Sequence, residues 1–331
     1  MSRFPKLSIL DLVRVKNGRT RADALAETLA LAQHAEAEGF HRFWVAEHHN
    51  MPGIASAATS VVIGHIAAGT RNIRVGAGGI MLPNHAPLVI AEQFGTLATL
   101  FPGRIDLGLG RAPGTDGLTL RALRRTQGAD QFPQDVLELQ ALLAPAEPGQ
   151  RVEAVPGSGT KVPLWILGSS LFGAQLAAAF GLPYAFASHF APDALIEALA
   201  EYRAGFQPSE QQAKPHAMVA VNIITAETDA KAAHLARSQR AYFAGVVRGN
   251  AQLLMPPEES HEDPGVQGQV DRMLACSIVA GRDNLAARLD ELLARTRADE
   301  LIIVCDIFEP ELRHRALSII ADVAGPGGST A

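Results

Sequence analysis

The sequence predicts a single (β/α)8 barrel, and three observations support this fold class. Short apolar runs alternate with amphipathic helical stretches eight times along the 331 residues, as expected when each strand is followed by a helix. The main competitor is a doubly wound sheet, but its Gly-x-Gly-x-x-Gly turn is missing, since the glycines at 76–79 and 108–114 have other spacings. The third observation is the length, since a chain of this size can form a single α/β barrel domain. We therefore expect one domain over 1–324 and a flexible tail over 325–331.

The expected strands are short apolar runs bounded by Gly, Pro or charged residues. Such runs are typical of parallel strands that are buried on both faces. They lie at Leu7–Leu12, Arg42–Glu47, Ile73–Leu82, Arg104–Leu109, Pro163–Leu167, Tyr184–Ser188, Met218–Thr225 and Glu300–Cys305. In a barrel the carboxyl ends of all these strands meet at one face, and the chemistry is expected there.

The expected helices follow the strands and repeat their apolar residues with the helical period. The first begins after Thr20, because Thr20 and Asp23 have the spacing of a capping box, and it ends at Gly39. The others lie at Ser56–Ala68, Pro87–Leu100, most of Thr115–Leu143, Gly173–Phe180, Asp193–Phe206, Asp229–Val247, Asn284–Arg297 and Pro310–Val323. Residues 248–270 lack periodicity and contain three prolines, so we expect an excursion after strand seven, such as a lid.

Composition and charge exclude several classes of function. The net charge of −5 leaves no basic footprint for nucleic acid. The chain has no apolar run long enough to span a membrane and no signal-peptide stretch, so we expect a cytoplasmic protein with no membrane partner. Cys276 and Cys305 have no metal-type spacing, which suits a reducing compartment, and no metal site is expected. None of the five lysines ends a strand, which argues against Schiff-base chemistry.

Two segments on neighbouring strands have the residue types of a phosphate site. Arg111 lies in a glycine-rich turn after strand four, where glycine lets the backbone approach closely and arginine can bind two oxygens at once. Ser169 and Ser170 follow strand five and open a helix, which suits an anion. Taken singly, Arg111 has the ordinary interpretation of a surface charge, and the serines that of a helix cap. Together, we expect them to hold one phosphate.

Polar residues also follow strand two. Alternation along the strand directs Glu47 and His49 to one side and His48 to the other. Adjacent histidines on a strand cannot easily ligate one metal, so His48 is better interpreted as a general base or a contact to a cofactor ring. The alternative is that one or both are loop histidines exposed to water.

Two further segments each have a functional and an ordinary interpretation. The glycines at 76–79 interrupt strand three, and they indicate either a β-bulge or room for a flat group against the backbone. Ser188 and His189 end strand six, where His189 is either a cofactor contact or a loop histidine above Phe190.

Three longer segments carry a resemblance to a known family. They read Phe-Trp-Val-Ala-Glu-His-His at 43–49, Val-Gly-Ala-Gly-Gly-Ile-Met-Leu-Pro-Asn-His-Ala-Pro at 75–87 and Pro-Gly-Arg-Ile-Asp-Leu-Gly-Leu-Gly-Arg at 102–111. Together they resemble the bacterial luciferase-like flavin monooxygenases, and most of all the single-chain alkanal-monooxygenase-like subgroup. The resemblance runs from strand one to the last helix and is densest over 40–114 and 163–192.

This resemblance implies a (β/α)8 barrel that binds reduced FMN, supplied by a separate NAD(P)H:flavin reductase, at its carboxyl face. It implies that His48 is the active-site histidine and that Glu47 tunes it. The residues matching the family's flavin contacts are Arg111, Ser169 and Ser170 for the phosphate, Ala77 and Gly78, often joined by a non-proline cis peptide, for the ring, and more loosely Ser188 and His189 for the ring.

The implied reaction is oxygenation of a small organic substrate, such as an aldehyde, by O2 through a C4a-hydroperoxyflavin. The same family includes F420-dependent oxidoreductases and non-catalytic flavin-binding proteins, which are the alternatives. It also implies a homodimer formed through early helices. Light emission is not implied, because the position of the reactive cysteine of luciferase is Gly110 here and residues 248–270 are shorter than the luciferase lid.

Overall fold

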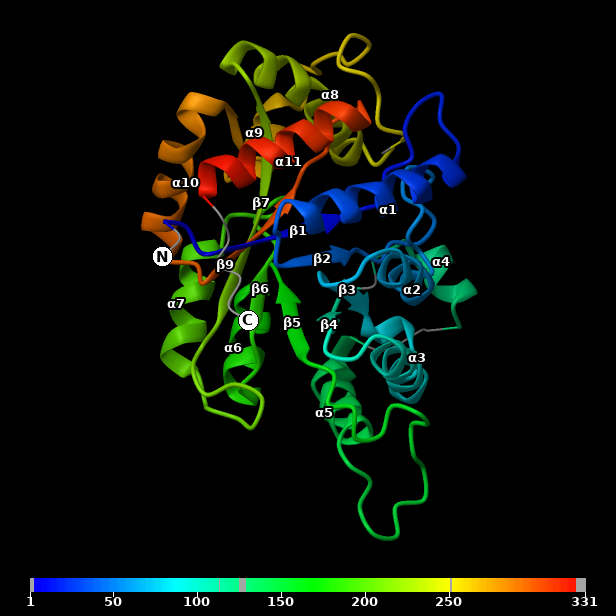
Figure 1. The fold of residues 1–331 in the computed structure, drawn as a ribbon. Helices are drawn as coiled ribbons and strands as arrows, with labels where there is room; N and C mark the ends of the chain where they lie inside the picture. Colours follow the sequence, from blue (N-terminus) through cyan, green and yellow to red (C-terminus); the bar gives the residue numbers. More distant parts are fainter. Residues whose placement is uncertain (1–2, 113, 125–128, 251, 326–331) are drawn as a thin grey trace.

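Eight parallel strands close into a barrel in the computed structural model, which describes residues 3–112, 114–124, 129–250 and 252–325 (Figure 1). The strands neighbour one another in chain order, and pairing of the last with the first closes the ring. They are β1 (Lys6–Asp11), β2 (Arg42–Val45), β3 (Arg74–Met81), β4 (Ile105–Gly110), β5 (Leu164–Gly168), β6 (Tyr184–Phe186), β7 (Ala217–Ala226) and β9 (Glu300–Val304). The predicted barrel is therefore confirmed. Of the expected tail over 325–331, residues 326–331 lie outside the described residues.

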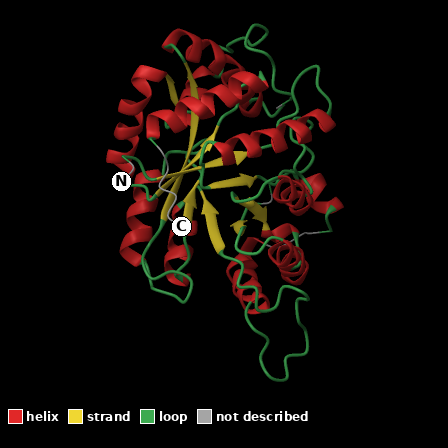
Figure 2. Ribbon diagram, in the orientation of Figure 1, coloured by secondary structure: helices red, strands yellow, loops and turns green. Residues whose placement is uncertain are grey.

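Helices form the outer layer around these strands (Figure 2). The principal helices are α1 (Arg21–Ala37), α2 (Thr59–Gly69), α3 (Pro87–Leu100), α5 (Phe132–Leu143), α6 (Leu171–Phe180), α7 (Leu195–Gly205), α8 (Asp229–Val247), α10 (Arg282–Thr296) and α11 (Pro310–Ala324). Shorter ones are η1 (Leu82–Asn84), α4 (Gly117–Ala122), η2 (Ala129–Gln131) and α9 (Gln267–Met273). The capping box expected at Thr20 is present, because the Thr20 and Asp23 side chains each accept a hydrogen bond from the other's backbone N–H. Among the described residues, no helix has the length and apolar character needed to cross a bilayer.

The structure adds one strand that the sequence reading missed. β8 (Ile278–Gly281) pairs in parallel with the carboxyl end of β7, from Ile223 opposite Ile278 to Ala226 opposite Gly281, and so extends β7 beyond the barrel. This run has only four residues, and α10 begins at the next residue.

The expected excursion after strand seven is present, and α9 forms within it. Part of it packs back on the loop after β1, because Leu254 N–H donates to the Val15 carbonyl at 3.1 Å and the Leu254 carbonyl accepts from Asn17 N–H at 2.8 Å. The yellow loop beside α8 in Figure 1 is this segment. The excursion therefore lies at the carboxyl end of β1, next to the barrel mouth.

The apolar core has two layers, which follow from alternation along the strands. Side chains such as Ile9 and Val75 point outward and pack against the helices, whereas Leu10, Trp44 and Trp165 point into the barrel. Successive residues of a strand face opposite sides of the sheet, so one run of residues supplies both layers.

A buried charged cluster closes the amino end of the barrel. Arg42, at the start of β2, donates to Asp106 Oδ2 at 2.7 Å and to Glu300 Oε1 at 2.8 Å. Burial alone would raise the pKa of Glu300, but the charge of Arg42 and hydrogen bonds from His216, Arg42 and Ser8 outweigh it and lower the pKa to about 2. Because this cluster fills the amino end, space for a ligand remains at the carboxyl end.

Candidate active site

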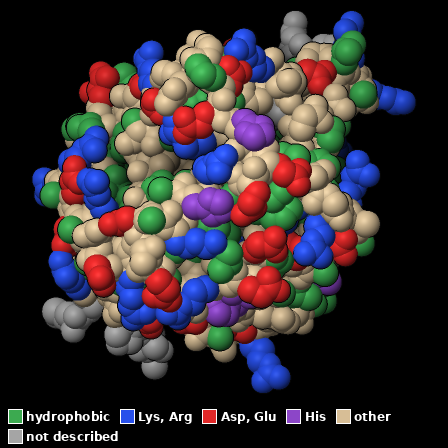
Figure 3. All heavy atoms as spheres, turned by 90° about the horizontal axis from the view of Figure 1, so that it is seen from above, with side chains coloured by type: hydrophobic (Ala, Val, Ile, Leu, Met, Phe, Trp, Pro, Cys, Tyr) green, Lys and Arg blue, Asp and Glu red, His purple; other side chains and the backbone are tan. Residues whose placement is uncertain are grey.

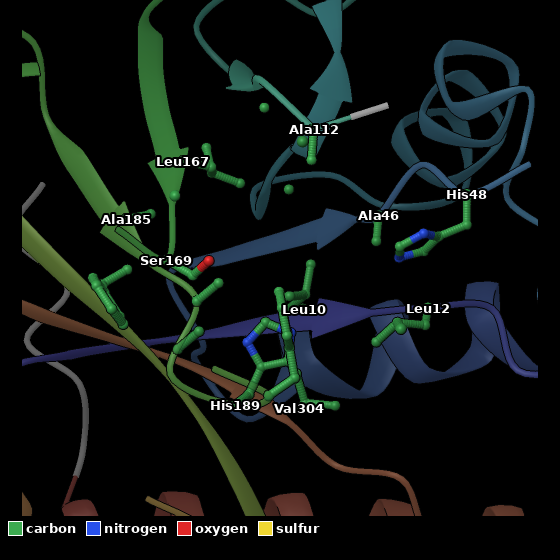
Figure 4. Close-up of a pocket in the computed structure, with 18 of the residues that line it drawn as sticks. Leu10, Leu12, Ala46, His48, Ala112, Leu167, Ser169, Ala185, His189 and Val304 are labelled. Carbon is green, nitrogen blue, oxygen red and sulfur yellow. The ribbon is translucent and has the colours of Figure 1, made fainter. Parts of the chain in front are cut away.

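A cavity of about 350 Å³ opens among the carboxyl ends of the barrel strands. This volume lies within the usual range for small-molecule sites, and its lining is mainly apolar. In Figure 4 the imidazole rings of His48 and His189 point into a space bordered by Leu10, Leu12 and Val304. The predicted position of the site, at the carboxyl face, is where this cavity lies.

The segments predicted to hold a phosphate both border this cavity. Arg111 follows β4, and its guanidinium carbon lies 4.0 Å from the ring centroid of Phe172, in the first turn of α6. Ser169 and Ser170 lie between β5 and α6. The side chain of Ser170, the N-cap of α6, makes no capping hydrogen bond, so it leaves the first N–H groups of α6 without a side-chain acceptor. The two segments converge as predicted, and their role in binding phosphate stays a prediction.

The small residues of β3 border the cavity one position later than predicted. Gly78 and Gly79 line it, whereas Ala77 is buried in the outer layer against the helices. The cis peptide also joins Gly78 to Gly79. A Cβ on Gly78 would lie 2.6 Å from Leu10 Cδ1, and one on Gly79 would lie 2.7 Å from the Gly108 carbonyl oxygen. Gly79 meets backbone, so glycine is required there, whereas the atom facing Gly78 is the movable end of the Leu10 side chain. The Ala77–Gly78 pair is corrected to Gly78–Gly79 as the wall of the cavity.

The two candidates after β6 have different surroundings. His189 borders the cavity, and burial lowers the pKa of its imidazole to about 3. Ser188 is fully buried, and its hydroxyl donates to the Ala220 carbonyl at 2.5 Å, so it ties β6 to β7 instead of lining the cavity. The expectation that Ser188 contacts a ligand in this cavity is therefore corrected, whereas His189 remains a candidate.

The residues after β2 separate as alternation predicts. His48 lines the cavity, while the Glu47 carboxylate turns to the other side and accepts hydrogen bonds from His49 Nε2 at 2.7 Å, His85 Nε2 at 2.8 Å and Met81 N–H at 3.0 Å. Burial would raise the pKa of Glu47, but these hydrogen bonds and the charge of His85 outweigh it and lower the pKa to about 2. Glu47 thus ties the end of β2 to the end of β3.

Glu47, His49 and His85 also form a group whose ligand atoms all lie within 4.8 Å of one another. Two ligands of a tetrahedral zinc ion are about 3.3 Å apart, given metal–ligand bonds near 2.0 Å. Both histidine nitrogens here lie closer than that to a single carboxylate oxygen, at 2.7 and 2.8 Å. The geometry is that of hydrogen bonds, and the expectation of no metal stays a prediction.

Comparison with known proteins agrees with this geometry. Residues 6–300 match the family model described as luciferase-like monooxygenase. The chain is 49% identical over 321 residues to a protein named luciferase-like monooxygenase from Escherichia coli K12, and 50% identical over 322 residues to the YvbT protein of Bacillus subtilis 168. Each alignment covers 96% of both chains. The chain belongs to the luciferase-like monooxygenase family. It is an enzyme of that family.

Solved structures of luciferase-like barrels have the same architecture. Apo-MsnO8 matches with a TM-score of 0.91 at 33% identity, covering 97% of this chain and 98% of that one. The oxygenating constituent of 3,6-diketocamphane monooxygenase from Pseudomonas putida, in complex with FMN, matches at 0.71 and 17% identity, with 97% of each chain covered. An F420-dependent secondary alcohol dehydrogenase matches at 0.68 and 15%, covering 96% and 98%. At 17% and 15% identity, the last two structures show a shared fold alone.

In this luciferase-like monooxygenase, the sequence reading missed a buried ion pair beside the cavity. Arg14 follows β1 and Asp306 follows β9, and Arg14 Nε and Nη2 lie 2.9 and 2.8 Å from one oxygen, Asp306 Oδ2. The Tyr242 ring of α8 lies over the Arg14 guanidinium, with its centroid 3.8 Å from the guanidinium carbon. The available signal was Arg14 just beyond β1 and Asp306 just beyond β9, since these two strands are neighbours in the closed barrel.

Proposed function

We propose that this enzyme is a flavin-dependent monooxygenase that uses reduced FMN and O2 to oxygenate a small, largely apolar organic substrate. The observation that carries the proposal is the convergence of Arg111 and the amino end of α6 on one apolar cavity at the barrel mouth. An FMN-bound and an F420-bound barrel with the same fold support a flavin or a deazaflavin as the cofactor class.

The residues present fit the phosphate of such a cofactor. Arg111 is exposed at the rim, and among the described residues no carboxylate forms an ion pair with it. The uncapped N–H groups of α6 supply further donors, and the helix dipole favours an anion there. Phe172 holds the guanidinium beside these donors through a cation–π contact. Arg111, Ser169 and Ser170 would therefore bind the phosphate group.

The backbone at Gly78 and Gly79 would support the flat ring of the flavin. Neither residue has a Cβ, so the ring could lie close to the backbone of β3. A bound reduced flavin supplies the electrons that let O2 transfer one oxygen atom to the substrate. The apolar lining, with Leu10 and Leu12, excludes water from this reaction. His189 would border the ring from the β6 side.

His48 is proposed as the group that takes up or releases a proton beside the substrate. Burial, followed by the charge of Arg14, lowers the pKa of His48, so the imidazole is neutral near pH 7 and can accept a proton. Its Nδ1 has no hydrogen-bond partner among the described residues. Glu47 does not reach the cavity, and we propose that it acts as a positioning residue by fixing the backbone on either side of His48.

Two partners are part of this proposal. A separate NAD(P)H:flavin reductase would supply the reduced flavin, and a second copy of the chain would form a homodimer through the early helices. Val61 on α2 and Val89 and Leu100 on α3 are exposed apolar side chains that support the second partner. Cys276 and Cys305 are free thiols, which accords with a reducing compartment such as the cytoplasm.

The test is titration of the purified chain with FMN, reduced FMN and F420, followed by oxygen uptake with a flavin reductase and a panel of aldehydes and other small substrates. We expect reduced FMN to bind more tightly to the native chain than to Arg111→Ala, and Arg21→Ala, an exposed arginine at the start of α1, to match the native chain. Preference for F420 with no oxygen uptake would support an F420-dependent oxidoreductase. Flavin binding without substrate-stimulated uptake would support a non-catalytic flavin-binding protein.

A further inference from the structure

Four buried side-chain atoms that border one part of the cavity have no hydrogen-bond partner among the described residues. They are Arg14 Nη1, Asp306 Oδ1, His48 Nδ1 and His189 Nδ1. Buried polar atoms are nearly always hydrogen-bonded, and an unpaired one costs free energy. Four such atoms beside one cavity therefore indicate groups that a bound molecule completes.

These four side chains reach the cavity from four different strand ends. Arg14 follows β1, His48 follows β2, His189 follows β6 and Asp306 follows β9. Arg14 interacts electrostatically with both histidines, and Asp306 with His189, so the four groups lie within range of one another. We call these four residues the polar subsite.

The ion pair leaves one donor and one acceptor unused. Arg14 directs both Nε and Nη2 to the same oxygen of Asp306, Oδ2, and this leaves Nη1 as a free donor and Oδ1 as a free acceptor. The Tyr242 ring covers the guanidinium and keeps the pair in place. A ligand that offers both an acceptor and a donor could satisfy both members of the pair.

The net charge of the subsite selects among such ligands. The charges of Arg14 and Asp306 cancel, and burial lowers the pKa of both histidines, so that they are neutral near pH 7. A neutral buried site gives no compensation for desolvating a carboxylate or an ammonium group. The apolar wall formed by Leu12, Ile54 and Phe243 suits a hydrocarbon portion beside the polar group.

We propose that the polar subsite binds a neutral amide group of the substrate, with the carbonyl accepting from Arg14 Nη1 and the N–H donating to Asp306 Oδ1. The substrate class is then an amide with an apolar chain. This assignment rests on the proposed function, because it places the amide as the recognised end of the molecule that is oxygenated.

The first experiment compares three ligands of equal chain length by calorimetry at pH 7, in the presence of FMN. Hexanamide carries the neutral amide, hexanoate carries a negative charge and hexylamine a positive one. We expect hexanamide to bind at least tenfold more tightly than either charged molecule. Equal or tighter binding of hexanoate would overturn the proposal.

Two variants then test the residues. Arg14→Met with Asp306→Leu removes both charges together, because removing one would leave the other buried and unpaired, and we expect it to abolish the preference for hexanamide. Asp306→Asn keeps a side-chain oxygen that can accept the Arg14 hydrogen bonds but removes the negative charge. Arg14 then gives the subsite a net positive charge, so we expect the preference to move at least tenfold towards hexanoate. Asp322→Asn, at the exposed pair with Arg282, is the matched control and should behave as the native chain. A native preference in both subsite variants would refute the assignment.

FMN titration of each protein separates this proposal from the proposed function. Both subsite variants should keep the FMN affinity of the native chain, since Arg111 and Ser169 are unchanged, and this also shows that they are folded. If FMN binds but hexanamide has no advantage, the subsite assignment alone fails. If hexanamide is preferred but no flavin binds, the subsite stands as a binding site and the proposed function fails.

Discussion

Replacing Glu47 by glutamine should lower stability in a way that depends on pH. The carboxylate is 1% exposed and accepts three hydrogen bonds, from His49, His85 and the Met81 backbone. Its pKa is lowered from 4.5 to about 2. At about 1.4 kcal/mol per pKa unit, the folded state favours the charged form by roughly 3 kcal/mol. Glu47→Gln should therefore cost about 3 kcal/mol of unfolding free energy at pH 7.

The sign of the pH effect follows from the lowered pKa. The stabilisation by Glu47 is fully present above pH 4.5 and is lost as the pH falls towards 2, because the unfolded chain takes up the proton first. By pH 3, linkage predicts that roughly 2 kcal/mol of the difference between the native chain and Glu47→Gln has disappeared. The other acidic residues contribute to both proteins alike, so the difference isolates Glu47.

Urea denaturation followed by circular dichroism at pH 7, 5, 4 and 3 measures this difference directly. Glu197→Gln, an exposed glutamate on α7, is the matched control and should change stability by less than about 0.5 kcal/mol. A Glu47→Gln penalty that stays constant from pH 7 to pH 3 would refute the reasoning, since it would show that the carboxylate is not held in its charged form. A penalty below about 1 kcal/mol at pH 7 would show that the three hydrogen bonds to Glu47 do not stabilise the fold as argued.

Four other predictions concern binding, turnover, stability and assembly. Arg111→Ala should weaken FMN binding by about 1.5–3 kcal/mol, the value of a charged hydrogen-bonded contact, and an unchanged dissociation constant would remove Arg111 from the phosphate site. His48→Ala should lower turnover more than flavin affinity in parallel kinetics and titration, whereas loss of flavin binding would make His48 a cofactor contact. Arg42→Met should cost about 3 kcal/mol in urea denaturation, because it removes the cation that two buried carboxylates share and leaves Asp106 with Arg74 and Glu300 with His216. Val61→Glu, on the exposed face of α2, should convert a dimer to a monomer in light scattering, and an unchanged mass would place the dimer interface elsewhere.

The barrel could be predicted because its signals are local and repeated. Each apolar run predicts a strand without reference to the others, and eight of them with intervening helices leave few architectures. β8 was missed because its run of four residues is short and α10 begins at the next residue, so the sequence analysis assigned these residues to no element. What pairs them with β7 is a distant strand, which no window of the sequence contains.

The direction of a side chain at the site could be predicted where alternation decides it and could not where strand register decides it, while the roles of these residues stay predictions. His48 and Glu47 face opposite ways, as a period of two requires. Either Ala77 or Gly79 could line the cavity beside Gly78. Which of them does so depends on an irregularity in the pairing of β3 with β4, between Ala77 and Ile80. Ser188 was misplaced for a related reason: its hydroxyl bonds across the sheet to Ala220, and the sequence of β6 alone does not show that partner.

Two arginines that line the cavity, Arg14 and Arg111, differ in burial and in pairing. Arg14 is buried and neutralised by Asp306, whereas Arg111 is exposed and has no paired carboxylate among the described residues. The face seen from above has acidic, basic and histidine side chains intermingled (Figure 3). The proposed phosphate site lies where this exposed cation meets the end of α6 that has no side-chain cap, since such an end favours an anion. The proposed amide site lies at the buried pair, where a second anion would compete with Asp306 for the same guanidinium. If both proposals hold, the substrate and cofactor bind with the charged phosphate at the rim and the uncharged amide at the buried pair.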